Sequence, residues 1–521
     1  MTAAPGRAWW REGVLYQVYV RSFADADGDG SGDLRGLIDR LDHLAWLGID
    51  GVWLTPIMPS PGADGGYDVS DYRDVDPGFG SLADLDELLA AGRERGIRVL
   101  LDLVPNHTSD RHPWFLEARS GRDSPRRDWY VWAPPRADGS PPNNWLSAFG
   151  GPAWTLDEAS AEYYLHTFLP QQPDLDWWNP AVRAAFDEIL RFWFARGVAG
   201  FRIDVPHFVV KDPELRDNPG PQEGDPWWVH RHGQRLVWNF MRPELQGVLR
   251  RWRAVADAQE PPRLLVGEGV IEGDHVAAFY GSDGDGLQMT FHLGLANAPY
   301  DAVALREVVE EAERLLPPGS QPLWTLGNHD IARYGTRWAG GDPRRARAAL
   351  VLLFGLRGTP TLYYGDELGL GDAALPSDRT RDSEGRDPQR TPMPWSPGPG
   401  GGFTEAGVEP WLPLGDRDGL TVAEQRDDPQ SALSLTRDLI ALRRRSPDLR
   451  TGAYSRLEAP EGVWAWRRGD ATVVAVNLSG GELAVEPVDG AIAVATARER
   501  DGERVDERLE LGAWEAAIVS G

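Results

Sequence analysis

Short, almost continuously apolar runs alternate with longer amphipathic segments along most of the chain. Runs of this kind are typical of strands buried on both faces of a parallel sheet. We predict eight strands, at residues 14–20, 51–55, 98–104, 200–205, 263–268, 287–293, 323–327 and 359–364.

The segments between these runs carry helix start and stop signals. Apolar residues recur at helical spacing between Asp33, a candidate N-cap, and Gly48. A second helix is expected from Asn179-Pro180 to Gly197. Strands that alternate with helices form βαβ units, and eight repeats predict a closed (β/α)₈ TIM barrel of the α/β class.

Two segments interrupt the alternation and predict additional domains. Residues 105–174 are rich in Trp, Pro and Arg and are expected to form an inserted domain after the third strand. Residues 450–521 contain short alternating runs, which predict a C-terminal antiparallel β-domain. The barrel then comprises residues 1–104 and 175–449.

Acidic side chains follow several of the predicted barrel strands. Active sites of TIM barrels lie at the carboxyl ends of the strands. One such acid could simply cap the next helix, but several acids and two histidines together indicate chemistry. These residues are Asp102, Asp204, Glu268, Asp330, His107 and His329.

Asp204 and Glu268 end adjacent predicted strands, as expected for the two carboxylates of glycoside hydrolysis. Arg202 and Asp204 share one face of their strand, so the guanidinium is expected to keep Asp204 ionised as the nucleophile. Glu268 follows an apolar run, and a drier setting raises the pKa of a general acid. We therefore expect different environments for the two acids.

Four motifs resemble glycoside hydrolase family 13, the α-amylase superfamily, in the family's order. The resemblance implies Asp204 as nucleophile, Glu268 as acid/base, Asp330 as a transition-state stabiliser, and His107 and His329 as sugar contacts. The motifs are Asp102-Leu-Val-Pro-Asn-His107, Gly200-Phe-Arg-Ile-Asp204, Val266-Gly-Glu268 and Asn328-His-Asp330.

Further motifs resemble the α-glucosidase and oligo-1,6-glucosidase branch. Residues 172–175, Gln-Pro-Asp-Leu, are similar to the signature of this branch. The segment from Asp64 to Asp68, which includes Tyr67, resembles the end wall of the sugar pocket, where an Asp pairs with an Arg. Arg386 is favoured over Arg390 as that Arg. A pocket closed behind one glucose implies exo-action on short α-glucosides.

Some positions depart from the family pattern. His207 and Phe208 replace the Lys-His of true α-amylases, and Gly269-Val270 replaces the usual pair after the acid/base. Val205 is common in isomaltose-cleaving relatives, whereas residues 211–219 resemble maltose-type α-glucosidases of high-GC bacteria. The linkage preference therefore stays open between the maltose type and the isomaltose type.

A glycine-rich acidic loop precedes the first predicted barrel helix. Alternating oxygen donors can surround a hard cation, although Gly36 stands where a full EF-hand has its bidentate Glu. The resemblance implies structural Ca²⁺, with Mg²⁺ as the other candidate, and a metal-free turn is the alternative. The donors are Asp25, Asp27, Asp29, the Ser31 backbone carbonyl and Asp33.

The amino-acid composition limits which binding partners and which cellular compartment we expect for this protein. The net charge of −26 disfavours nucleic acid and anionic membranes but permits a neutral oligosaccharide substrate. The chain has no Cys, no recognisable secretory signal at residues 1–10 and no apolar run of membrane-spanning length. We therefore expect a cytoplasmic protein, and no feature indicates a particular oligomeric state.

Three other functions compete with the α-glucosidase. A transglucosylase, such as a trehalose synthase, would use the same acids with a sugar in place of water. A non-catalytic barrel relative, such as the ectodomain of an amino-acid transporter heavy chain, would need a membrane helix and usually lacks the acids. A pure sugar-binding protein would leave Asp204 and Glu268 unexplained.

Overall fold

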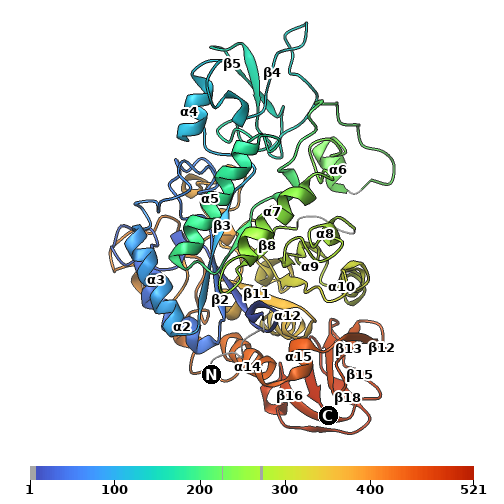
Figure 1. Cartoon of the computed structure of the whole chain (residues 1–521). Coiled ribbons are helices and arrows are strands. Elements are labelled where there is room, and N and C mark those ends of the chain that lie inside the picture. Colours follow the sequence, from blue (N-terminus) through green and yellow to red (C-terminus); the bar gives the residue numbers. More distant parts are fainter. Residues whose placement is uncertain (1–7, 226, 270–273) are drawn as a thin grey trace.

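The computed structural model describes residues 8–225, 227–269 and 274–521 (Figure 1). Val270 and residues 1–7, on which two of the expectations above rest, lie outside the described residues. Within the described part of the chain, no helix has the length and apolar character needed to cross a membrane.

The central sheet is a parallel barrel in the strand order β10-β11-β1-β2-β3-β7-β8-β9. A parallel bridge between Phe291 and Leu323 links its two edges. Each predicted run contains one barrel strand, so the TIM-barrel prediction is confirmed. The strands are β1 (Leu15–Val18), β2 (Gly51–Leu54), β3 (Arg98–Leu103), β7 (Gly200–Ile203), β8 (Leu264–Gly267), β9 (Met289–Thr290), β10 (Leu323–Thr325) and β11 (Thr359–Tyr363).

The predicted caps shape the helices around the barrel. Asp33 accepts a hydrogen bond from Gly36 at the start of α2, and Gly48 ends this helix with a φ of 99°. Asn179 and Gly197, which has a φ of 105°, bound α5 in the same way. The long helices are α2 (Leu34–Leu47), α3 (Leu82–Glu94), α5 (Pro180–Arg196), α7 (Leu245–Asp257), α10 (Ala302–Leu315), α12 (Pro343–Gly355) and α14 (Ala432–Arg445).

Short helices complete the connections between these elements. They are α1 (Trp9–Glu12), α4 (Pro113–Arg119), α6 (Trp227–His232), α8 (Asp274–Ala278), α9 (Leu293–Asn297), α11 (Tyr334–Arg337), α13 (Val422–Gln425) and α15 (Pro447–Thr451).

The insertion after β3 and the C-terminal domain lie at opposite ends of the molecule in Figure 1. The insertion contains a three-stranded antiparallel sheet of β4 (Trp132–Ala133), β6 (Glu162–Leu165) and β5 (Trp154–Asp157). The C-terminal domain is antiparallel as predicted, and its Trp466 donates a hydrogen bond to the Gly355 carbonyl at the end of α12. The domain boundaries stay predictions, and α15 spans the one at 449/450.

The C-terminal strands form a six-stranded sheet and a two-stranded sheet. The larger sheet contains β12 (Tyr454–Leu457), β13 (Val463–Arg468), β14 (Thr472–Asn477), β19 (Ala516–Ser520), β16 (Gly490–Ala495) and β17 (Arg504–Val505). The smaller sheet pairs β15 (Leu483–Val485) with β18 (Leu509–Leu511).

Candidate active site

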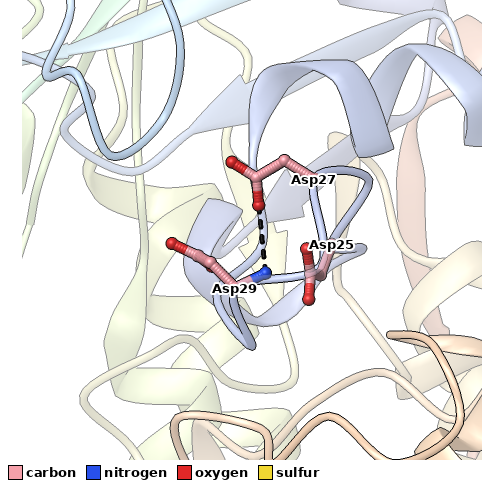
Figure 2. A group of neighbouring side chains, drawn as sticks. All are labelled: Asp25, Asp27 and Asp29. Atoms are coloured by element: carbon pink, nitrogen blue, oxygen red, sulfur yellow. Dashed lines mark hydrogen bonds between the residues drawn. The ribbon is translucent and has the colours of Figure 1, made fainter.

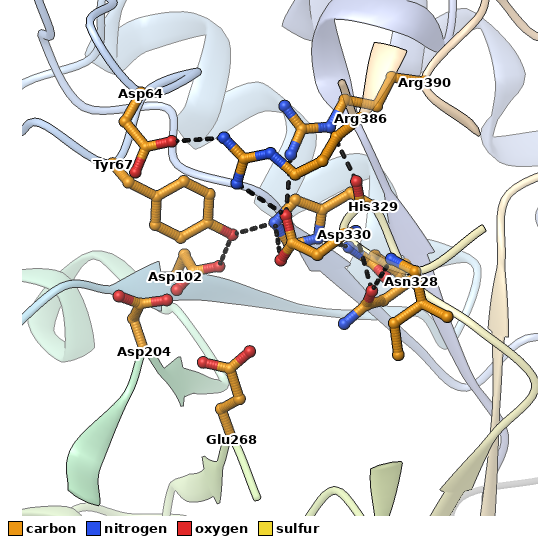
Figure 3. Close-up of polar contacts among 12 residues, drawn as sticks. Asp64, Tyr67, Asp102, Asp204, Glu268, Asn328, His329, Asp330, Arg386 and Arg390 are labelled. Carbon is orange, nitrogen blue, oxygen red and sulfur yellow. Dashed lines mark hydrogen bonds and ion pairs between the residues drawn. The ribbon is translucent and has the colours of Figure 1, made fainter. Parts of the chain in front are cut away.

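The register of two neighbouring barrel strands brings Asp204 and Glu268 together. Ile203 of β7 pairs with Gly267 of β8, and the two acids are the residues that directly follow these strand ends. Adjacent strands lie about 4.8 Å apart. Both side chains are buried, and in Figure 3 they lie below Asp330 and two arginines.

One buried guanidinium, that of Arg202, forms ion pairs with both acids. Arg202 Nη1 lies 2.7 Å from Asp204 Oδ1, and its Nη2 lies 2.8 Å from Glu268 Oε1. The same Nη1 lies 2.9 Å from Asp102 Oδ1. The contact between Arg202 and Asp204 is present as expected. The expectation of different environments for Asp204 and Glu268 is wrong, because the fork of the guanidinium reaches the neighbouring strands as well.

Burial raises the pKa of both Asp204 and Glu268, and the charge of Arg202 opposes this increase. Burial raises the pKa of Asp102 in the same way. Since one cation faces three carboxyl groups, the group holds at least one proton more readily than isolated carboxylates would. A carboxyl group with a raised pKa is suited to act as a general acid.

The backbone after Asp204 is strained. Val205 has a φ of 35°, a value that a β-branched residue rarely adopts. Its N–H donates a 3.0 Å hydrogen bond to Glu268 Oε2. The strained turn thereby couples the position of one acid to that of the other.

Asp330 lies in a cationic environment. Arg390 Nη2 and Arg386 Nη1 lie 2.8 Å and 3.1 Å from its Oδ1, and His329 Nε2 lies 3.1 Å from its Oδ2. Burial opposes ionisation, but these three neighbours outweigh it and lower the pKa of Asp330. Asp330 is therefore an ionised carboxylate, and its pKa shifts in the direction opposite to those of the acid pair on β7 and β8.

Arg386, not Arg390, contacts Asp64. Its Nη2 lies 2.7 Å from Asp64 Oδ1 (Figure 3). The other oxygen of Asp64 accepts a 3.0 Å hydrogen bond from Gln172. Asp382 Oδ1 lies 2.6 Å from the same Nη2 of Arg386. Asp382 was missed from the sequence, because nothing in the irregular segment around it marks a partner of Arg386.

Tyr67 connects the acids that contact Arg202 with the charged group around Asp330. Its hydroxyl donates to Asp102 Oδ2 at 3.1 Å and lies 2.7 Å from His329 Nε2. The Tyr67 and His329 rings stack with centroids 5.4 Å apart. His107 lies next to Tyr67, with its Nε2 3.2 Å from the Tyr67 carbonyl.

The acidic loop before α2 brings three carboxylates together. Oxygens of Asp25, Asp27 and Asp29 lie within 4.8 Å of one another (Figure 2), and this all-oxygen set fits a hard cation. Asp33 is not part of this group. Its two oxygens accept hydrogen bonds from backbone N–H groups, as do those of Asp25. A Cβ at Gly36 would lie 2.1 Å from the Ala24 carbonyl, so no bidentate Glu fits there.

The model of the alpha-amylase catalytic domain matches residues 17–452, which is most of the chain. The chain belongs to the α-amylase family. Among members of this family, a probable alpha-glucosidase of Rhizobium meliloti (strain 1021) is 41% identical over 544 residues, covering 98% of this chain and 97% of the relative. An oligo-1,6-glucosidase of Heyndrickxia coagulans is 35% identical, covering 92% and 94%.

Two solved structures resemble nearly the whole chain. The alpha-glucosyl transfer enzyme XgtA has a TM-score of 0.91 and 39% identity, covering 98% of this chain and 99% of its own. The trehalulose synthase MutB has a TM-score of 0.90 and 31% identity, covering 99% and 100%. The family and the fold expected from the motifs are confirmed.

Proposed function

We propose that the protein is a retaining, exo-acting α-glucosidase that releases α-glucose from the non-reducing end of short α-glucosides. The observation that carries the proposal is the adjacent pair Asp204 and Glu268, bridged by Arg202 at the ends of β7 and β8. Relatives named alpha-glucosidase and oligo-1,6-glucosidase along nearly the whole chain support it.

In the proposed mechanism, Asp204 attacks the anomeric carbon while Glu268 protonates the leaving glycosidic oxygen. Glu268 then takes a proton from the water that opens the covalent glucosyl–Asp204 intermediate. The ionised Asp330 stabilises the developing positive charge of the sugar. His107 and His329 hold sugar hydroxyls.

The first product is expected to be α-glucose. Acids on paired strands about 4.8 Å apart match the retaining separation of about 5–5.5 Å, whereas inversion needs about 6.5–9.5 Å to fit a water. Two inversions restore the starting configuration. NMR during the first minutes of hydrolysis, before mutarotation, identifies the anomer, and initial β-glucose would overturn the role given to Asp204.

Starch is expected to be a poor substrate compared with maltose or an aryl α-glucoside. In the proposed sugar pocket, the contact between Asp64 and Arg386 forms the end wall and closes the space behind one glucose. Comparing kcat/KM for soluble starch and for maltose tests this expectation. Efficient release of long oligosaccharides from starch would contradict a closed pocket.

Transglucosylation is the second candidate function. Its specific support is the 39% identity to XgtA, a transfer enzyme, over 98% of this chain. A sugar hydroxyl in place of water would intercept the same glucosyl–Asp204 intermediate. Rates and products with maltose, isomaltose, sucrose, kojibiose and trehalose separate hydrolysis from transfer and establish the linkage preference.

We propose that Asp25, Asp27 and Asp29, with the Ser31 carbonyl, hold a structural Ca²⁺, with Mg²⁺ as the other candidate. The cation would offset the repulsion among three neighbouring carboxylates. A cytoplasmic location and the absence of nucleic-acid and membrane partners stay predictions from composition.

Removing divalent ions is expected to lower Tm by about 2–3 °C if the free ion is near 100 times its Kd. Removing the ion should affect the activity at low temperature less than it affects the thermal stability, since the loop is separate from the acid pair in sequence. Melting curves with and without a chelator, together with elemental analysis, test this. A purified protein without bound metal would contradict the proposal.

A further inference from the structure

The single lysine of the chain, Lys211, is buried. It contacts Asn106, the residue that precedes His107. It follows β7, and its Nζ lies 3.0 Å from Asp174 Oδ2 and 2.6 Å from Asn106 Oδ1. Asp174 is also buried and accepts hydrogen bonds from the Thr167 backbone N–H and hydroxyl. The mechanism proposed above leaves this buried ion pair without a role.

The ion pair determines the orientation of the Asn106 amide. An ammonium group offers only donors, so the carbonyl oxygen of Asn106 must face Lys211. The amide nitrogen of Asn106 then donates to Asp174 Oδ1 at 3.1 Å and lies 3.2 Å from His107 Nδ1. The opposite orientation would set two donors against each other at Lys211 and two acceptors at Asp174.

The amide orientation in turn selects the tautomer of His107. Burial lowers the pKa of His107, so the ring is neutral and carries one proton. Because the Asn106 N–H points at Nδ1, this nitrogen accepts. The proton then lies on Nε2, which donates to the Tyr67 carbonyl at 3.2 Å.

Gln172 favours the other tautomer. Its Nε2 lies 3.0 Å from His107 Nε2 and would donate to an unprotonated nitrogen there. Gln172 cannot easily turn, because its Oε1 accepts from the Leu169 N–H and its Nε2 donates to Asp64. The Nε2 side of His107 thus faces both an acceptor, the Tyr67 carbonyl, and a donor, the Gln172 amide, so the group that faces Nδ1 decides the tautomer.

We infer that Lys211 and Asp174 are a positioning pair that, through Asn106, keeps the ring proton of His107 on Nε2. His107 thus offers a donor, not an acceptor, beside Tyr67. The inference rests on the proposed function in one respect, namely that His107 contacts the sugar.

The ¹⁵N signals of the histidine rings test the inference, with His107 assigned by its loss in His107→Gln. The wild-type protein should show protonated Nε2 and unprotonated Nδ1. In the double variant Lys211→Met/Asp174→Asn, which removes both charges together, Asn106 is no longer held with its oxygen toward residue 211. Its oxygen can then turn toward Nδ1, and together with Gln172 this should move the proton to Nδ1. We expect kcat/KM for an aryl α-glucoside to fall about tenfold.

Arg216→Gln is the matched control, because Arg216 pairs with Asp212 in the same loop without contacting Asn106. It should leave the tautomer unchanged and kcat/KM within about twofold of the wild type. If the double variant does not fold, Asn106→Asp replaces it, since a carboxylate facing Nδ1 must draw the proton there.

Protonated Nδ1 in the wild type would overturn the inference, as would an unchanged tautomer in the folded double variant or in Asn106→Asp. These ring signals do not depend on turnover. A wild-type protein that fails to hydrolyse α-glucosides would therefore refute the proposed function without deciding the tautomer.

Discussion

Replacing Asp204 with Asn is expected to lower kcat for α-glucoside hydrolysis on the order of 10⁴-fold or more and to leave the fold intact. The amide has nearly the shape of the carboxylate but cannot act as the nucleophile at the anomeric carbon. It also removes one of the three acids that share Arg202, which limits the structural cost. Turnover of an aryl α-glucoside and circular dichroism melting measure the two effects.

Asp187→Asn is the matched control for this substitution. Asp187 is also buried but lies on α5, where it pairs with Arg251. It should affect stability and leave kcat nearly unchanged. Near-normal turnover by a correctly folded Asp204→Asn protein would refute the nucleophile assignment.

The barrel was predictable because its signals are local. Apolar runs mark buried strands, and caps such as Asp33 and Gly197 bound helices through contacts a few residues away. The predicted run at 287–293 shows the limit of such signals, since only Met289–Thr290 pairs as β9. Apolar character reports burial, whereas strand length depends on pairing with other parts of the chain.

The acid pair could also be located from the sequence, because strand ends converge at one end of a barrel. The ion pair between Asp64 and Arg386 could not be located in this way. Asp64 and Arg386 are 322 positions apart, and only the resemblance to a family connected them. Asp382 carries no such motif and was missed.

The expectation of different environments for Asp204 and Glu268 failed for a related reason. The alternation of side chains along β7 relates Arg202 to Asp204, two residues away on the same strand. It says nothing about residues on β3 and β8, and these strands supply Asp102 and Glu268. A long, forked side chain at a barrel mouth selects its partners across strands, so a single-strand pattern could not predict that the three acids share one cation.

Replacing Arg202 with Met is expected to cause the second large loss, about 10³-fold in kcat/KM. Removing the counter-ion of buried carboxylates should also cost about 3–5 kcal/mol of stability. Arg202→Lys retains the positive charge without the forked guanidinium, so it should lose less kcat/KM and less stability than Arg202→Met. This variant keeps the test informative if the Met variant does not fold.

The pH dependence gives the sharper test of Arg202. The charge of Arg202 lowers the pKa values of Asp204 and Glu268 against the effect of burial. Without it both pKa values rise, so Asp204 becomes ionised only at higher pH and the acid limb of kcat/KM should move upward. Arg443→Met is the control, because this buried arginine binds the Leu449 and Gly358 carbonyls and should change stability without moving that limb. An acid limb that stays in place or moves to lower pH in Arg202→Met would show that Arg202 is not the shared counter-ion of the catalytic pair.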